Sequence, residues 1–341
     1  MNRVPTTLVV VAFALGTATS LATSWLAVQR LERLGERFGF SEAALGLLAA
    51  FAADAPEITA AATAFAHHHH AVGAGVALGS NVFNLAALLG LGALVAGRLH
   101  LHRRVVVLGG AVALWIAAWT AAAVAQGCSA TVALAACLVA LVPYIAVLAA
   151  GPARLGARSA SGPAASRRAL RWLAAAVEDE ETELSPAIRP KRGRALAAAV
   201  AAGAVAAVVA ASVAMESAAT TLGSRWSVPG IVVGGLVLAA VTSLPNVVAA
   251  VYLASRGRGA AVLSTAFNSN AFNAVAGLLL PAVAAGSLDL GSGGLLVAAS
   301  FVGLTALSVG LAHRGRGLGR PAGAVLVGAY AIFALALAVI S

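Results

Sequence analysis

The chain has 341 residues, of which 61% are hydrophobic and 10% charged, and its mean hydropathy is +0.94. A soluble domain is nearer half apolar and a quarter charged. This composition excludes a soluble enzyme, a secreted disulfide scaffold and a disordered tail, and it predicts an integral membrane protein whose solvent is the lipid bilayer. The net charge of +10 does not indicate a nucleic-acid partner, because the basic residues stand in short islands between apolar runs.

Ten apolar runs are long enough to cross a bilayer as helices, which takes about 20 residues each. Backbone amides in hydrocarbon must be paired internally, so the runs are helices or the strands of a closed barrel. Their length, without a two-residue alternation, favours helices. The predicted fold class is therefore an all-α integral membrane protein with about ten transmembrane helices. The runs cover residues 5–29, 44–66, 72–97, 105–126, 130–152, 196–222, 228–254, 260–284, 294–312 and 322–340.

Basic residues gather in alternate loops between these runs. The loops after spans one, three, five, seven and nine hold all the Lys and Arg residues except Arg3 and Arg225. The positive-inside rule places these loops in the cytoplasm. We therefore expect both termini outside, in a plasma (inner) membrane of bacterial type.

The central stretch, residues 153–195, is the one long polar segment, and we expect it to be a cytoplasmic loop. A short helix is predicted over Arg167–Val177, and an acidic run from Glu178 to Glu183 follows it. The acidic run is either a divalent-cation sensor or a solvated stretch that balances its basic neighbours.

Two stretches of the chain repeat one polar pattern. The prolines of the two copies, and their final asparagines, are each 189 residues apart. The first copy starts on a span that runs outward and the second on a span that runs inward. The pattern therefore predicts two inverted five-helix repeats, residues 1–152 and 196–341. Such repeats place a substrate near the midplane between interrupted helices, and they permit alternating access. The copies are Ala55-Pro56-Glu57 with Gly79-Ser80-Asn81-Val82-Phe83-Asn84, and Leu244-Pro245-Asn246 with Asn268-Ser269-Asn270-Ala271-Phe272-Asn273.

The repeated pattern supplies oxygen atoms that suit a cation. Pro56 and Pro245 each interrupt a helix and free backbone carbonyls. Asp54 and Glu57 share one helix face; a carboxylate at mid-bilayer costs about 2.5–3.5 kcal/mol on insertion scales, which indicates a functional role. Two acids so close can share one proton, which gives protons a place in the cycle. Neutral oxygens come from Ser80, Asn84, Ser269 and Asn273. Together these groups form a hard oxygen site, and the expected ligand is a small cation.

The two copies resemble the α-repeats of the calcium/cation antiporter superfamily, the sodium/calcium exchanger-like membrane proteins. The resemblance covers both halves and implies an antiporter, not an enzyme, that exchanges Ca²⁺ for Na⁺, or for K⁺ or H⁺ in some branches. It implies no cofactor beside the transported cations. By position, it implies the side-chain ligands Glu57, Asn246, Thr242, Ser243, Ser80, Asn84, Ser269 and Asn273, and the backbone carbonyls of Ala50 and Ala239.

This sequence departs from the family pattern, and three of the departures affect the site. Family members usually carry T-S-L-P-E in both halves, but here the second half ends in the amide Asn246. The first half has the acid Asp54 at the serine position, and Asn268 stands where glycine is usual. Both acids thus lie in one repeat, and they can still neutralise a divalent ion. An antiporter for Na⁺ (or K⁺) and H⁺ that does not carry calcium is the alternative.

Three other features leave their roles open. Asn81 and Asn270 are either ligands or interhelical hydrogen-bonding groups. Glu216, toward the outer end of the sixth span, lines an ion path or is an interfacial or packing acid. The run His67–His70 is a transition-metal site, a pH sensor or an outside polar loop without function. A membrane-embedded enzyme is disfavoured, because the sequence has neither H-E-x-x-H nor G-x-S-x-G.

Overall fold

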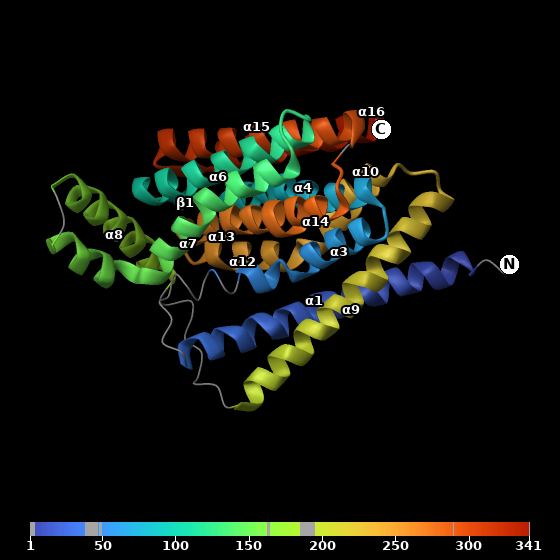
Figure 1. Cartoon of the computed structure of the whole chain (residues 1–341), viewed down its shortest axis with the longest axis horizontal. Coiled ribbons are helices and arrows are strands. Elements are labelled where there is room, and N and C mark those ends of the chain that lie inside the picture. Colours follow the sequence, from blue (N-terminus) through green and yellow to red (C-terminus); the bar gives the residue numbers. More distant parts are fainter. Residues whose placement is uncertain are drawn as a thin grey trace.

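Apolar helices dominate the computed structural model of the chain, and most of them run roughly side by side in one bundle (Figure 1). The structure describes residues 4–37, 47, 50–161, 164–184, 195–288 and 290–340. Within these ranges seven helices are long and apolar enough to cross a membrane, or eight if one bent pair is a single span. The all-α membrane fold class is confirmed. The count of ten is not confirmed: the expected span 44–66 lies partly outside the described ranges, and the expected span 260–284 is not among the seven or eight.

The first half of the chain forms two central helices and longer helices around them. A break at Gly151, whose φ of 69° lies in the left-handed region, divides α7 close to the expected end of the first repeat. The elements are α1 (Thr6–Arg37), α3 (Ala55–Ala66), α4 (His70–Asn84), the π-helix η1 (Leu85–Leu91), α5 (Gly92–Ala96), β1 (Arg98–His100), α6 (Arg103–Val124), α7 (Ala130–Ser161) and α8 (Ala164–Leu184).

The second half has a similar order of helices, but its strand β2 follows α15, whereas β1 precedes α6, and it has no counterpart of α8. Its elements are α9 (Ala195–Arg225), α10 (Gly230–Val232), the π-helix η2 (Val233–Leu238), α11 (Ala239–Thr242), α12 (Leu244–Ser255), α13 (Gly259–Phe272), the π-helix η3 (Asn273–Leu279), α14 (Leu280–Ala285), α15 (Gly291–Gly315), β2 (Gly317–Gly319) and α16 (Arg320–Ile340). The bent pair is α10–η2–α11 with α12, which meet at 47°.

The internal repeat is visible in the elements themselves. Helix α12 begins and ends 189 residues after α3, the same offset as in the polar pattern. The turn after each helix contains a residue with positive φ at equivalent positions, His68 at 61° and Gly257 at 74°. A π-helical segment begins at or just after the last asparagine of each copy, Asn84 and Asn273. Such segments are rare and occur frequently at functional sites.

Small residues bring the centre of the two halves together. Gly75 and Gly79 on α4 face Gly235 in η2, and a Cβ added to Gly79 would overlap the backbone of Gly235. A Cβ on Gly75 would lie 2.8 Å from the nitrogen of Gly235. The helices therefore touch backbone to backbone, as small residues allow in membrane bundles. Helices α1 and α9 pack against each other on one side of the bundle, where α9 crosses obliquely and also contacts α3 (Figure 1).

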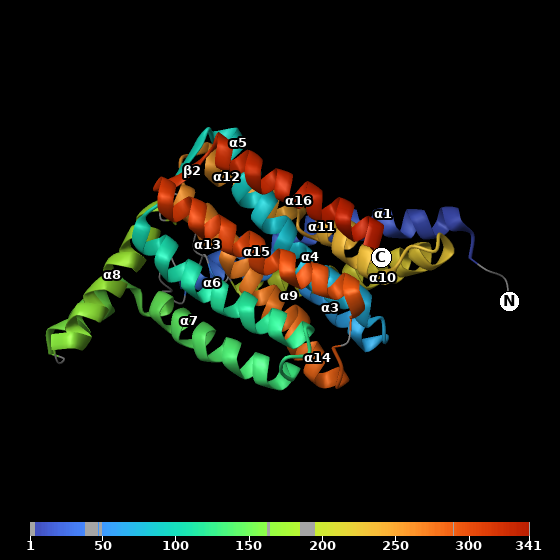
Figure 2. The same ribbon diagram turned by 90° about the horizontal axis from the view of Figure 1, so that it is seen from above.

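The two ends of the bundle differ. Helix α1 begins and α16 ends toward one end, whereas α8 and the strands lie toward the other (Figures 1 and 2). Strands β1 and β2 pair antiparallel, with Leu99 opposite Leu318. This ladder was not predicted from the sequence, because three residues are too few to show a two-residue alternation. Helix α8 extends beyond the predicted Arg167–Val177 at both ends and includes the acidic run.

Candidate cation site

Two helix starts bring the predicted ligands to the centre of the bundle. Helices α3 and α12 each carry a proline in their first turn, Pro56 and Pro245, where an absent N–H breaks no helical hydrogen bond. The residues just before these helices, Asp54 and Ser243, have the same φ of −81°. Glu57 lies in the first turn of α3, where the positive end of the helix dipole stabilises a carboxylate.

Three polar side chains of the second half bind the two acids of the first half. Oδ1 of Asp54 accepts hydrogen bonds from the Asn246 amide at 2.8 Å and from the Ser269 hydroxyl at 2.6 Å. Oε1 of Glu57 accepts one from the Ser243 hydroxyl at 2.8 Å and a longer one from Asn246 at 3.5 Å. All five residues are at most 1% exposed. A single amide group thus links the two carboxylates in a closed cluster.

Each acid keeps one oxygen for another partner. Among the described residues nothing hydrogen-bonds to Oδ2 of Asp54 or to Oε2 of Glu57. The same is true of Oδ1 of Asn246, Oδ1 of Asn84 and Oγ of Ser80. A buried polar atom left without a partner costs about 1–3 kcal/mol. Several unpartnered oxygens in one cluster therefore indicate a binding site for a positively charged group.

Asn84 and Asn273 occupy equivalent positions in the two copies. The Asn84 amide donates to the Ser269 hydroxyl at 3.0 Å, which joins α4 to the cluster. Asn273 is fully buried, and neither its amide nitrogen nor its oxygen has a hydrogen-bond partner in the described part of the chain. The side-chain oxygens of both asparagines thus have no hydrogen-bond partner among the described residues, and they come from opposite halves of the molecule.

The predicted backbone ligands lie one turn before the helix starts. The carbonyls of Ala50 and Ala239 accept hydrogen bonds from the backbone N–H groups of Asp54 and Ser243, at 3.0 and 3.2 Å. The Thr242 hydroxyl donates to the carbonyl of Leu238 at 2.8 Å. Each of these oxygens retains a lone pair.

Side-chain hydrogen bonds bring together some of the predicted ligands and leave others outside the cluster. The connected residues are Asp54, Glu57, Asn84, Ser243, Asn246 and Ser269. Within the described ranges no side-chain hydrogen bond joins Ser80, Thr242 or Asn273 to them. Ala50 and Ala239 reach the cluster through the backbone bonds alone.

Asn81 and Asn270 hold the two central helices together. The amide of each residue donates to the backbone carbonyl of the other, at 3.1 Å in both directions. The reciprocal bonds join equivalent positions of the two repeats, as a local two-fold axis between α4 and α13 requires. The structure thus shows both side chains in interhelical hydrogen bonds, and Oδ1 of Asn81 has no hydrogen-bond partner among the described residues.

Comparison with known proteins identifies the family. The family described as sodium/calcium exchanger protein matches residues 8–150 and 196–339, which include both copies of the repeat. The chain belongs to the sodium/calcium exchanger family. It is an integral multi-pass membrane protein of a family of ion exchangers, which are not enzymes. None of the curated proteins compared with this exchanger matches it.

Solved structures share the exchanger's fold. The H⁺/Ca²⁺ exchanger CAX has a TM-score of 0.71 at 12% identity, over 98% of this chain and 86% of that chain. The sodium-calcium exchanger NCX_Mj has a TM-score of 0.59 at 20% identity, over 96% of this chain and 98% of that chain. Native YfkE has a TM-score of 0.58 at 15% identity, over 96% and 92% of the two chains.

Glu216 lies apart from the central cluster and is fully buried. Its Oε1 accepts a hydrogen bond from the Thr220 hydroxyl at 3.0 Å and lies 3.4 Å from Nδ1 of His69. Its Oε2 lies 3.7 Å from Nδ1 of His67 and 3.4 Å from the Ser217 hydroxyl. Both carboxylate oxygens are thus partnered, in contrast to Glu57. No three His, Cys, Asp or Glu side chains are grouped to hold a metal ion within the described ranges. These contacts favour a packing role for Glu216.

Two contacts near the site were not predicted from the exchanger's sequence. The Tyr144 hydroxyl on α7 donates to Oδ1 of Asn268 at 3.0 Å, next to Ser269. The Ser24 hydroxyl on α1 donates to the carbonyl of Ala52 at 3.4 Å. Neither Tyr144 nor Ser24 belongs to the repeated pattern. The unusual Asn268 was the one sequence signal for the first contact, and there was none for the second.

Proposed function

We propose that this exchanger transports Ca²⁺ in exchange for Na⁺ or H⁺ at the cluster around Asp54 and Glu57. The observation that carries the proposal is the set of unpartnered carboxylate and amide oxygens, buried at the junction of the two repeats. Ca²⁺ takes six to eight oxygen ligands from carboxylates, amides, carbonyls and water. With only two acids in the cluster, the remaining ligands are the amide, hydroxyl and carbonyl oxygens of the predicted set.

The charge of the two acids supports exchange rather than simple release. Two ionised carboxylates in the membrane interior are costly when nothing neutralises them. One Ca²⁺ neutralises them, and so do two Na⁺ ions or two protons. If the site cannot change the side to which it opens while both acids are uncompensated, one kind of cation can leave only when the other kind binds. This requirement couples the two fluxes.

The two-fold arrangement supports alternating access. The ligands come from helix breaks in both halves, at equivalent positions around the Asn81 and Asn270 contact. Inverted repeats of this kind open one side or the other by rocking about a fixed site. We propose the orientation that the basic loops predict, with both termini outside and the loop 153–195 in the cytoplasm.

A second candidate follows from the position of Asn246. Its amide N–H groups point at both carboxylates, where the usual family pattern has an acid. Compared with an acid at this position, the amide lacks one negative charge. Its N–H groups also occupy lone pairs on the carboxylates of Asp54 and Glu57. These contacts favour a monovalent Na⁺ (or K⁺)/H⁺ exchanger that does not carry calcium.

Equilibrium dialysis of radioactive Ca²⁺ against the purified exchanger distinguishes the two candidates. We expect about one Ca²⁺ to bind per chain and to be displaced by Na⁺ or by acid. An exchanger that binds no Ca²⁺, yet moves protons in response to an imposed Na⁺ gradient in liposomes, would establish the second candidate.

A further inference from the structure

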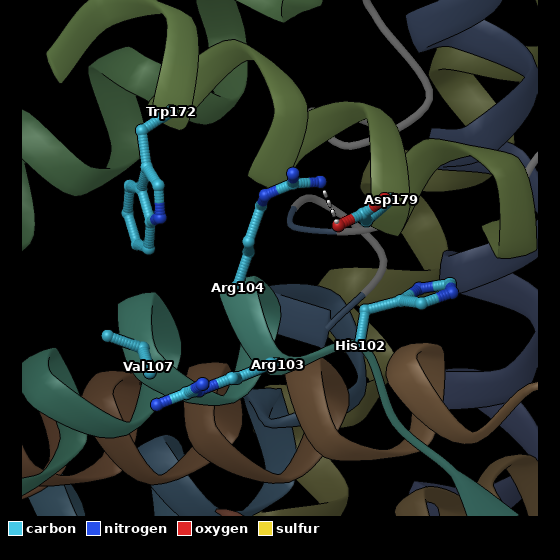
Figure 3. A pocket seen from close by; sticks show the side chains of 6 residues that line it. All are labelled: His102, Arg103, Arg104, Val107, Trp172 and Asp179. Atoms are coloured by element: carbon cyan, nitrogen blue, oxygen red, sulfur yellow. Dashed lines mark hydrogen bonds and ion pairs between the residues drawn. The ribbon is translucent and has the colours of Figure 1, made fainter. Parts of the chain in front are cut away.

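A cavity of about 690 Å³ lies between α6 and α8, away from the central cluster (Figure 3). Its wall is formed by the start of α6 and one face of α8. Neither the repeated pattern nor the proposed transport cycle uses these residues. The lining residues are His102, Arg103, Arg104, Val107, Trp172 and Asp179.

Two arginines give the cavity a positive rim. Arg103 and Arg104 are adjacent at the start of α6 and are both exposed. Arg104 donates to Oδ2 of Asp179 on α8 at 3.3 Å, so part of its charge is balanced. Arg103 forms no ion pair with any other residue of the described ranges. The rim thus carries more positive than negative charge, which suits an anionic ligand.

Beside His102, the rest of the wall is formed by two apolar side chains. Trp172 projects from α8 toward Val107 on α6, and the side chain of Arg103 lies beneath that opening (Figure 3). Trp172 is 37% exposed and Val107 is 39% exposed. Because an inorganic anion gains nothing from an indole and a valine, these walls favour a ligand with an apolar part beside its phosphate.

The cavity also lies where lipid head groups lie. It opens at the end of a membrane-spanning helix, on the side of the bundle that carries α8 and the basic loops. Tryptophan is typical of this interfacial level, and basic pockets at it bind anionic head groups.

We propose that this cavity binds one anionic phospholipid, whose phosphate contacts Arg103 and Arg104 and whose glycerol and acyl carbons lie against Trp172 and Val107. Asp179 competes with the phosphate for Arg104. Because the bound lipid contacts both α6 and α8, it stabilises their packing. The extent of this stabilisation depends on the lipid composition of the leaflet.

Lipid titration of the delipidated, full-length exchanger in non-ionic detergent tests the proposal. The probes are phosphatidylglycerol, phosphatidylcholine and inorganic phosphate, and the readouts are the thermal midpoint and the bound lipid detected by native mass spectrometry. Phosphatidylglycerol should raise the midpoint of the unaltered protein, and the other two probes should not.

Variants distinguish a specific lipid-binding site from a general electrostatic attraction of anionic lipid to the protein. Each arginine near an anionic lipid contributes about 1 kcal/mol, so R103Q/R104Q should need about 30-fold more phosphatidylglycerol for half-maximal stabilisation. D179N should need less lipid than the unaltered protein. The matched control is R154Q/R158Q, which removes two exposed arginines from α7 on the same side of the molecule, and it should change the requirement less than about threefold.

Three results would overturn the proposal. Equal losses in the two double variants would mean general electrostatic attraction. Equal stabilisation by inorganic phosphate would mean a small-anion site. An unchanged or weakened response in D179N would mean that the lipid phosphate does not meet Arg104.

Discussion

Replacing Glu57 with glutamine tests the central ligand with the smallest change of shape. The unaltered side chain accepts hydrogen bonds from Ser243 and Asn246 on Oε1, and its Oε2 has no partner among the described residues. A glutamine oxygen can still accept both bonds. Its NH₂ group then faces the open side of the cluster, where a cation requires an acceptor. Folding should therefore change by less than about 1 kcal/mol.

The loss of binding follows from the lost charge. Two unit charges 4 Å apart interact by about 4 kcal/mol at an effective dielectric constant of 20, and a divalent ion doubles this to about 8 kcal/mol. Water and rearrangement reduce the difference, but even about 2 kcal/mol is a 30-fold loss of affinity. We expect E57Q to transport at less than about a tenth of the unaltered rate at limiting Ca²⁺.

The assay is cation uptake into liposomes, normalised to monodisperse protein. E216Q makes the same chemical change at another fully buried glutamate, whose oxygens are all partnered. This control should lower the thermal midpoint and keep most of the transport. If E57Q transports at the unaltered rate, or if E216Q loses transport to the same degree while still folded, Glu57 is not the central ligand.

Three other substitutions, one of them paired with a control, test separate parts of the structure. N246E restores an acid to the second half and should raise the affinity for divalent ions at least tenfold in the dialysis assay; unchanged affinity and selectivity would count against Asn246 as a ligand. G79A should lower the free energy of unfolding by about 1–3 kcal/mol and lower the thermal midpoint, because the new methyl group meets the backbone of Gly235. G303A, which has nothing within 4 Å of the added carbon, should leave the midpoint nearly unchanged, and equal effects would refute the close crossing. Y144F removes one buried hydrogen bond to α13 and should cost about 1 kcal/mol of stability; an unaltered midpoint would show that the bond contributes nothing.

The repeat made much of the fold predictable. Proline and asparagine positions separated by 189 residues predicted the helix starts and the central helices. The offset also paired Asn81 with Asn270, and reciprocal hydrogen bonds join these residues. Repetition was informative here because two copies of one pattern must meet around a common axis.

The contacts beyond the repeat could not be predicted. The contact between His69 and Glu216 joins residues 147 positions apart, and no periodicity relates a loop to a distant helix. For the same reason the apolar run around Tyr144 did not indicate which residue its hydroxyl would bind, although Asn268 itself was unusual. Asn246 was expected as a ligand, but its donation to both acids depends on the relative positions of α3 and α12, which a sequence pattern does not specify.

Radioactive Ca²⁺ uptake into proteoliposomes, under imposed Na⁺ or pH gradients, tests the proposed exchange most directly. We predict that an outward gradient of Na⁺ or H⁺ accelerates uptake in the unaltered exchanger, and that this acceleration is lost in E57Q. Uptake that no gradient changes, or Ca²⁺ that does not enter at all while Na⁺ and H⁺ exchange, would contradict calcium antiport at the Asp54 and Glu57 cluster.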